Sequence, residues 1–270
     1  MKDLWSGTYK EPSYWNETAV ELIAMAELQP GAAVLDVGTG YGGTLFRALD
    51  QIGEVGRIVG IDVETECVDW TKAEISKRGI SNAEILLMNA RSMSFPDESF
   101  DDVIAGMVGL DEDYDFDTGK AIDDAPMIRQ IFRVLKPGRW LYISNWLWQE
   151  HMEWMGELVR RYLPDCDKRG YFPATEEGYI NLLSGVGFAN IRTVGFDRRY
   201  TFDDPASWMA TTVEYMWKPE LDRIRALPSE RLRRFELDTF DLLEGHVTEE
   251  GKLSYRISAI LVAAQKPFAS

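Results

Sequence analysis

The chain has little of what a disulfide-bonded or metal-rich protein needs. Only two cysteines, Cys67 and Cys166, occur among its 270 residues, and they lie far apart. Two such cysteines cannot build a disulfide framework or a cysteine-rich metal site, so no metal centre is expected. Histidine is equally scarce, since His151 and His246 are the only two. A proton transfer that depends on histidine therefore has two candidates.

Positive charge and long apolar runs are also missing. Twenty-nine Lys and Arg face 45 Asp and Glu, which gives a formal net charge of −16. This charge repels phosphate backbones, so nucleic acid is not expected as a partner. The longest clean apolar run is the short segment 259–264, and the first residues lack the apolar stretch of a signal peptide. The sequence thus predicts an acidic, soluble, cytoplasmic protein without a membrane span.

Strand and helix patterns alternate through the first two-thirds of the chain. Strands are predicted at 33–37, 57–62, 84–88, 102–105 and 139–144, and helices at 17–28, 44–52, 65–78 and 126–135. This alternation predicts βαβ units, and therefore an α/β fold with a mostly parallel sheet and right-handed crossovers.

The C-terminal third departs from this alternation. A helix at 175–186 and a strand at 188–196 precede a long helical stretch at 204–243 that Pro205, Pro219 and Pro228 interrupt, and a last strand follows at 254–265. So much helix is too long for a simple crossover. We therefore predict a single domain, with a core of residues 31–200 and 253–270. Residues 1–30 form an N-terminal lid segment, and residues 201–252 form a helical lid inserted before the last strand.

A glycine-rich turn lies between the first strand and the following helix. It reads Asp36-Val37-Gly38-Thr39-Gly40-Tyr41-Gly42-Gly43. Glycines let the backbone approach a ligand closely, and the helix N-terminus beyond them offers unpaired N–H groups. Gly38, Gly40 and Gly43 also match the dinucleotide fingerprint, and a tight turn without any ligand is a further alternative.

Two acids bear on which ligand this turn would hold. Asp36 precedes the first glycine and would repel a pyrophosphate, but it would attract an ammonium or a sulfonium group. Asp62 ends the second strand at about the offset where an acid accepts both ribose hydroxyls. The pair favours an adenosine with free hydroxyls and a positive charge, although Asp62 could instead cap the next helix.

Four motifs in order resemble the class I S-adenosylmethionine-dependent methyltransferases, in particular the branch that modifies quinones and other small molecules. They are Val34-Leu35-Asp36-Val37-Gly38-Thr39-Gly40-Tyr41-Gly42, Gly60-Ile61-Asp62, Phe95-Pro96-Asp97-Glu98-Ser99-Phe100-Asp101 and Arg133-Val134-Leu135-Lys136-Pro137-Gly138, and they span about residues 30–145. The resemblance implies a Rossmann-like, doubly wound sheet of seven strands, the last of them antiparallel. It also implies S-adenosylmethionine as the cofactor.

The resemblance also assigns roles to residues. Asp36, Gly38, Thr39, Gly40 and Gly42 would surround the methionine part of the cofactor. Asp62 and Val63 would lie at the ribose, and Asn89, Ala90 and Arg91 at the adenine, where the family usually has Asp in place of Asn89. Gly106, with Met107 beside it, would face the transferred methyl group. Although Asn89 replaces the usual Asp, its side-chain amide oxygen can still accept a hydrogen bond from the adenine amine.

In-line displacement at an activated sulfonium depends mainly on alignment and on the exclusion of water. His151, beyond the fifth strand, and Asp111, after the fourth, are the candidate bases. We expect an apolar or aromatic acceptor to contact Tyr14, Trp15, Met107, Trp146 and Trp148.

The sequence thus predicts methyl transfer to a small molecule (EC 2.1.1). Two other classes stay open: a methyltransferase-like protein that binds the cofactor without transferring methyl, and a nicotinamide-dependent oxidoreductase. The identity of the acceptor and the oligomeric state, including a homodimer, also stay open.

Overall fold

The computed structural model describes residues 13–110, 113–166, 174–203, 205–213 and 216–268. The chain divides into two compact units. We call Tyr14–Leu147, Pro173–Phe196 and Ala259–Ser270 the sheet unit, and Met1–Ser13, Trp148–Phe172 and Asp197–Ser258 the helical unit. Each unit is described by itself.

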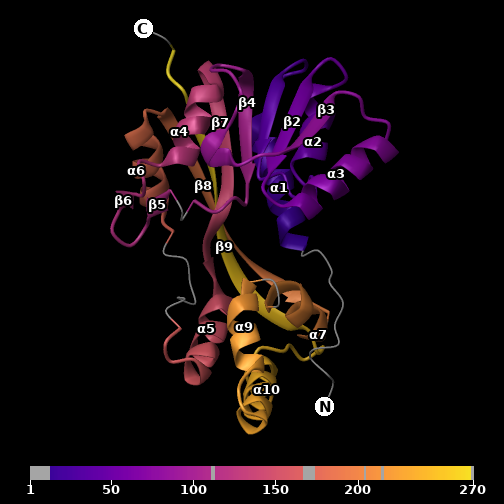
Figure 1. Cartoon of the computed structure of the whole chain (residues 1–270), viewed down its shortest axis with the longest axis vertical. Coiled ribbons are helices and arrows are strands. Elements are labelled where there is room, and N and C mark those ends of the chain that lie inside the picture. Colours follow the sequence, from indigo (N-terminus) through magenta and orange to yellow (C-terminus); the bar gives the residue numbers. More distant parts are fainter. Residues whose placement is uncertain (1–12, 111–112, 167–173, 204, 214–215, 269–270) are drawn as a thin grey trace. The chain divides into compact units, whose positions relative to one another are not determined.

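The sheet has seven strands in the order β3-β2-β1-β4-β7-β9-β8 (Figure 1). They are β1 Ala33–Val37, β2 Arg57–Asp62, β3 Ala83–Leu87, β4 Phe100–Gly106, β7 Leu135–Gln149, β8 Ala189–Phe202 and β9 Leu253–Gln265. The pairs β1–β2, β1–β4, β2–β3 and β4–β7 are parallel, whereas the last strand, β9, is antiparallel. The predicted fold class is confirmed. Three strands, β7, β8 and β9, belong partly to each unit.

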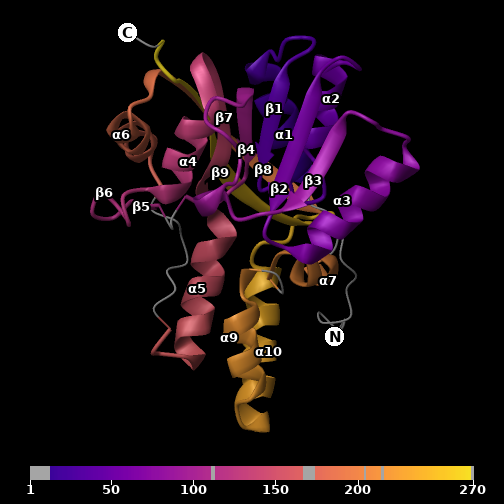
Figure 2. The same cartoon turned by 45° about the horizontal axis from the view of Figure 1, so that its top comes forward.

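Helices cover both faces of the sheet, because neighbouring residues of each strand point to opposite sides. On one face, Val34 packs with α1 Ser13–Ala26, α2 Leu45–Ile52 and α3 Thr65–Lys77. On the other face, Leu35 and Val37 pack with α4 Pro126–Val134 and α6 Glu176–Val186. Figure 2 shows this layering from a second side. In the predicted lid segment 1–30, helix α1 has Leu22, Ile23 and Ala26 buried in the core.

The fifth strand is longer than its predicted range of 139–144. Helix α4 stops at Val134, and Leu135 already has extended backbone angles, with φ −76° and ψ 134°. Pro137 disfavours helical angles in the residue before it, so the segment 136–138 continues as strand. A two-stranded sheet of β5 Tyr114–Asp115 and β6 Lys120–Ala121 was not expected from the sequence.

The helical unit contains four α-helices and one π-helical turn among its described residues. They are α5 Glu150–Tyr162, α7 Pro205–Trp208, the π-helical turn η2 Met209–Val213, α9 Lys218–Arg225 and α10 Ser229–Glu244, with α5 not predicted from the sequence. The prolines that interrupt the predicted 204–243 stretch lie at helix starts, where a missing N–H costs nothing. No helix in the described ranges has both the length and the apolar character needed to cross a membrane.

Candidate functional site

The glycine-rich turn after β1 has the backbone that its glycines predict. Gly38, Gly40 and Gly42 have φ values of +65°, +50° and +78°, a region that side chains disfavour. The turn is anchored because Thr39 N donates to Ile61 O at 3.0 Å and Gly42 N donates to Thr39 O at 2.8 Å. The backbone is therefore folded back over the ends of β1 and β2.

Replacing Gly38 with alanine should weaken cofactor binding by about tenfold. A Cβ atom on Gly38 would lie 2.5 Å from Val108 Cγ2, and the left-handed backbone adds about 1–2 kcal/mol of strain. Gly43→Ala is the matched control, because no heavy atom lies within 4 Å of a Cβ there. Calorimetric titration with S-adenosylhomocysteine measures both. Equal affinities in the two variants would contradict this role for Gly38.

Asp36 lies under this turn and organises it. Its carboxylate is fully buried and accepts hydrogen bonds from Thr39 Oγ1 at 2.7 Å and from Thr44 Oγ1 at 2.8 and 2.9 Å. Burial raises the pKa of Asp36 to about 6, the two hydroxyls oppose this rise, and the nearby charge of Asp62 adds to it. A carboxylate with these partners acts on a ligand through the turn that it holds.

Asp62 lies on the outer side of the same turn. Its Oδ2 accepts from Gly40 N at 2.8 Å and its Oδ1 accepts from Glu64 N at 2.9 Å. From α3, Thr71 Oγ1 donates to Gly40 O at 2.8 Å. Both predicted acids are therefore brought to one turn, and both polar groups of the Gly40 backbone have partners.

The predicted adenine segment follows β3. Residues Ala90–Ser92 form the short helix η1, and the Asn89 side chain caps it by accepting from Arg91 N at 2.8 Å. Asn89 is exposed, and Val63, at the end of β2, is 58% exposed. Arg91 forms an ion pair with Asp123 at 3.5 Å. The exposed groups here are thus the polar Asn89, in this segment, and the apolar Val63, which directly follows Asp62.

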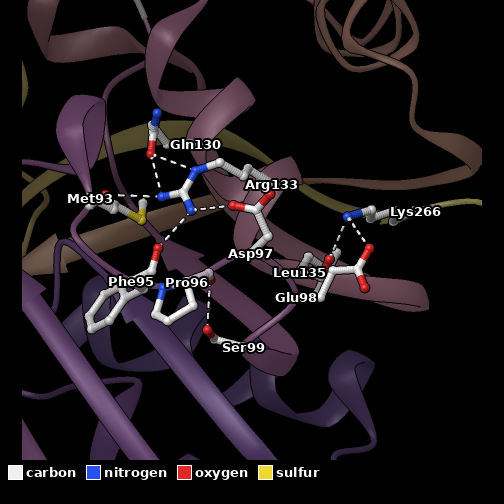
Figure 3. Close-up of polar contacts among 10 residues, drawn as sticks. All are labelled: Met93, Phe95, Pro96, Asp97, Glu98, Ser99, Gln130, Arg133, Leu135 and Lys266. Atoms are coloured by element: carbon white, nitrogen blue, oxygen red, sulfur yellow. Dashed lines mark hydrogen bonds and ion pairs between the residues drawn. The ribbon is translucent and has the colours of Figure 1, made fainter.

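Arg133 of α4 joins two of the recognised motifs (Figure 3). Its guanidinium donates to Met93 O at 3.0 Å, to Phe95 O at 2.6 Å and to the Asp97 carboxylate at 2.8 Å. Because Met93 directly follows η1, these bonds fix the chain that leaves the adenine segment. The third and fourth of these motifs are thus in direct contact in the structure.

At the carboxyl end of β4, Gly106 packs against Thr44, and a Cβ there would lie 2.7 Å from Thr44 Cγ2. Met107 follows with a positive φ of +56°. Trp146, on β7, is half-buried, and its backbone N–H donates to Asn145 Oδ1 at 2.8 Å. Gly106 pairs with Ser144 of β7, so the sheet unit has the predicted Gly106 and Met107 at the carboxyl end of β4 and Trp146 on the adjacent strand, two residues beyond Ser144.

The other predicted acceptor residues lie in the helical unit or in helix α1. Trp148, in the helical unit, donates from Nε1 to Glu153 Oε1 at 2.8 Å. Tyr14 and Trp15 lie in α1, but their side chains are outside what the structure describes, and so is Asp111. For these residues the predicted roles stay predictions.

His151 is enclosed by aromatic rings of the helical unit. Its ring centroid lies 4.5 Å from that of Tyr255 and 5.7 Å from that of Trp208. The side chain is fully buried, and neither ring nitrogen has a hydrogen-bond partner in the part of the chain that the structure describes. Burial lowers the pKa of His151 to about 3. The imidazole is therefore neutral at pH 7, with a low affinity for a proton, and its predicted role as a base stays untested.

Sequence reasoning missed two residues that hold the glycine turn, Thr44 and Thr71. Thr44 follows the last glycine, which was the available signal for it. Thr71 is on the next helix, and no local pattern distinguishes it from a threonine packed in the core.

Comparison with known proteins places the chain in a family. Residues 28–165 match the family model described as a methyltransferase domain. The chain is 36% identical over 94 residues to nocamycin O-methyltransferase of Saccharothrix syringae, which covers 35% of the chain and 34% of that relative. It is 28% identical to aklanonic acid methyltransferase DauC of Streptomyces sp. (strain C5), over 63% of the chain and 81% of the relative.

Among solved structures, the YcgJ protein of Bacillus subtilis superposes with a TM-score of 0.61 at 18% identity, covering 94% of the chain and 99% of YcgJ. That likeness concerns the fold alone. The chain belongs to the class I S-adenosylmethionine-dependent methyltransferase family. This membership confirms the predicted family and its cofactor. The chain spans about a third of the length of the nocamycin enzyme, so the acceptor of that enzyme is not assigned to this chain.

Proposed function

We propose that the chain transfers the methyl group of S-adenosylmethionine to a small apolar or aromatic acceptor. The observation that carries this proposal is the glycine turn between two carboxylates, Asp36 beneath it and Asp62 beside it. A negative site of this kind suits a sulfonium nucleoside with free ribose hydroxyls. In the proposed complex, Gly38, Thr39, Gly40 and Gly42 surround the methionine part.

The remaining cofactor contacts follow from the same proposal. Asp62 and Val63 hold the ribose, Asn89 with Ala90 and Arg91 lies at the adenine, and Gly106 faces the methyl group. The cofactor supplies an activated methyl group, so the protein contributes alignment and a dry environment. We further propose that residues 201–252 act as the lid that excludes water.

The geometry disfavours a nicotinamide dinucleotide in the same place. Gly40 N already donates to the Asp62 carboxylate, so that amide is not available to a pyrophosphate. Asp36 would add repulsion at short range, since a carboxylate with a pKa of about 6 is mostly ionised at pH 7.

An aromatic acceptor is supported by the half-buried Trp146 of β7, which lies two residues beyond the partner of Gly106 in that strand. The names of two relatives also speak for a small-molecule acceptor: nocamycin O-methyltransferase, and the demethylmenaquinone methyltransferase of Lactococcus lactis. A more polar acceptor would be in keeping with the phosphoethanolamine N-methyltransferase of Triticum aestivum, which is 28% identical over 176 residues.

The test uses the full chain with methyl-labelled S-adenosylmethionine and two probe acceptors, 1,4-dihydroxynaphthalene and phosphoethanolamine. We expect saturable cofactor binding by calorimetry and label transfer to the naphthalene compound. Transfer to phosphoethanolamine alone would overturn the aromatic acceptor. Binding without transfer to either probe would favour the alternative of a protein that holds the cofactor and transfers no methyl group. Binding of NADH in place of S-adenosylhomocysteine would overturn the whole proposal.

A further inference from the structure

Met107 has a backbone conformation that its side chain does not favour. It follows β4 immediately and has a φ of +56°, although it carries a long side chain. Outside glycine, the left-handed region is uncommon, and such residues persist only where their surroundings enforce them. The strained backbone of Met107, at the carboxyl edge of the parallel sheet, must therefore be held by its neighbours.

Two consecutive residues of β7 hold this segment. Met107 N donates to Ser144 O at 2.8 Å and makes a longer contact with Ser144 Oγ at 3.3 Å. Asn145 Nδ2 donates to Val108 O at 2.8 Å, while its Oδ1 accepts from Trp146 N. Ser144 is almost fully buried. Because the Asn145 amide is bonded at both ends, it ties the segment that follows β4 to the backbone of β7.

The same segment contacts the glycine turn. Val108 Cγ2 lies where a Cβ on Gly38 would come within 2.5 Å, so the valine packs directly over that glycine. β1 and β4 are neighbours in the sheet although β2 and β3 separate them in sequence, and ligands of open α/β sheets bind where the chain order reverses in this way. The strained residue thus lies at the switch point, one residue from a contact with the proposed cofactor site.

We propose that Ser144 and Asn145 are positioning residues that hold Met107 in its left-handed conformation, and that the Met107 side chain fixes the acceptor in line with the methyl group. This inference rests on the proposed function. It gives the strain a function: the bonds from β7 hold the backbone at Met107 and Val108, and this fixed backbone sets the position of the Met107 side chain.

The test is a double-mutant cycle between positions 107 and 145. Initial rates are measured with labelled S-adenosylmethionine and 1,4-dihydroxynaphthalene, and cofactor affinity by titration with S-adenosylhomocysteine. We expect Met107→Gly and Asn145→Ala each to lower kcat about tenfold and to leave the cofactor Kd within about twofold, since small misplacements act on the reacting geometry. The double variant should resemble the single ones, because both changes remove one device. Ser144→Thr, which keeps the hydroxyl, should retain more activity than Ser144→Ala.

Glu27→Gly is the matched control. Glu27 is an exposed non-glycine residue with a φ of +45° at the end of α1, so glycine relieves the same kind of strain there. We expect its kcat to equal that of the wild type, and the urea midpoints of Glu27→Gly and Met107→Gly to stay close to the wild-type value.

Three outcomes would overturn the inference: multiplicative losses in the double variant, a cofactor Kd that rises as much as kcat falls, or a large drop in the urea midpoint of Met107→Gly. A wild-type chain that neither binds S-adenosylhomocysteine nor transfers the label would instead overturn the proposed function itself, and the inference with it.

Discussion

Asp62→Ala should raise the Kd for S-adenosylhomocysteine by about 100-fold. In the proposed complex the carboxylate accepts from both ribose hydroxyls, and a hydrogen bond to a charged group contributes about 1.5–3 kcal/mol. The alanine also frees Gly40 N, which now donates to Oδ2 at 2.8 Å, so the glycine turn loses one of its anchors. Calorimetric titration at constant salt measures the loss.

Two further variants separate the causes of this effect. Asp62→Asn removes the charge but keeps one acceptor oxygen, and we expect a Kd increase of about tenfold, because a neutral hydrogen bond contributes roughly half as much. Glu64→Ala removes a neighbouring exposed carboxylate without touching the turn, so it should bind like the wild type. If Asp62→Ala bound the cofactor within threefold of the wild type, the assignment of Asp62 to the ribose would be wrong.

The sheet could be predicted from the sequence because its signals are local. The strands are short and apolar, end in glycines or in Asp62, and are separated by helices of ordinary length. This pattern is compatible with few strand orders other than those of a doubly wound sheet. The positions of the two acids at one turn also followed, since the carboxyl ends of neighbouring parallel strands meet at one edge. The turn is also held by Thr44 and Thr71, whose hydroxyls donate to Asp36 and to Gly40, and these two contacts were not predicted.

Long-range contacts explain the rest of what the sequence did not predict. The guanidinium of Arg133 bonds to carbonyls near η1, and a sequence motif alone does not reveal which backbone it reaches. In the same way, the left-handed conformation of Met107 depends on Ser144, far along the chain. Positive φ at a methionine contradicts its local propensity, and such conflicts between local and tertiary preferences are expected at functional sites.

The aromatic enclosure of His151, which the sequence offers as a candidate base, has a measurable consequence. In the folded state the imidazole of His151 is neutral, with a pKa of about 3, whereas in the unfolded chain the same imidazole has its ordinary pKa of about 6.5. Below pH 6.5 the unfolded state therefore binds a proton that the folded state does not. The contribution of His151 to the free energy of unfolding is fully present above this pH and falls by about 1.4 kcal/mol for each pH unit of acidification, until the pH approaches 3.

From pH 7.5 to pH 5, we expect the free energy of unfolding of the wild type to fall by about 2 kcal/mol more than that of His151→Phe. Phenylalanine keeps a ring beside Tyr255 and Trp208 but cannot take up a proton. Urea unfolding followed by tryptophan fluorescence measures it. The raised pKa values of Asp36 and Asp102 give a pH dependence of opposite sign, but both groups are present in each protein, so they cancel in the difference.

The second histidine supplies the control for this measurement. His246 stacks on Trp154 and is partly exposed, and burial lowers its pKa as well. Since it is less enclosed than His151, His246→Phe should change the pH dependence much less. If His151→Phe fails to fold, His151→Leu tests the same point without a second ring. Parallel pH profiles for the wild type and the folded His151 variant would show that this imidazole gains a proton in the native state, and that the aromatic enclosure opens to water well above pH 3.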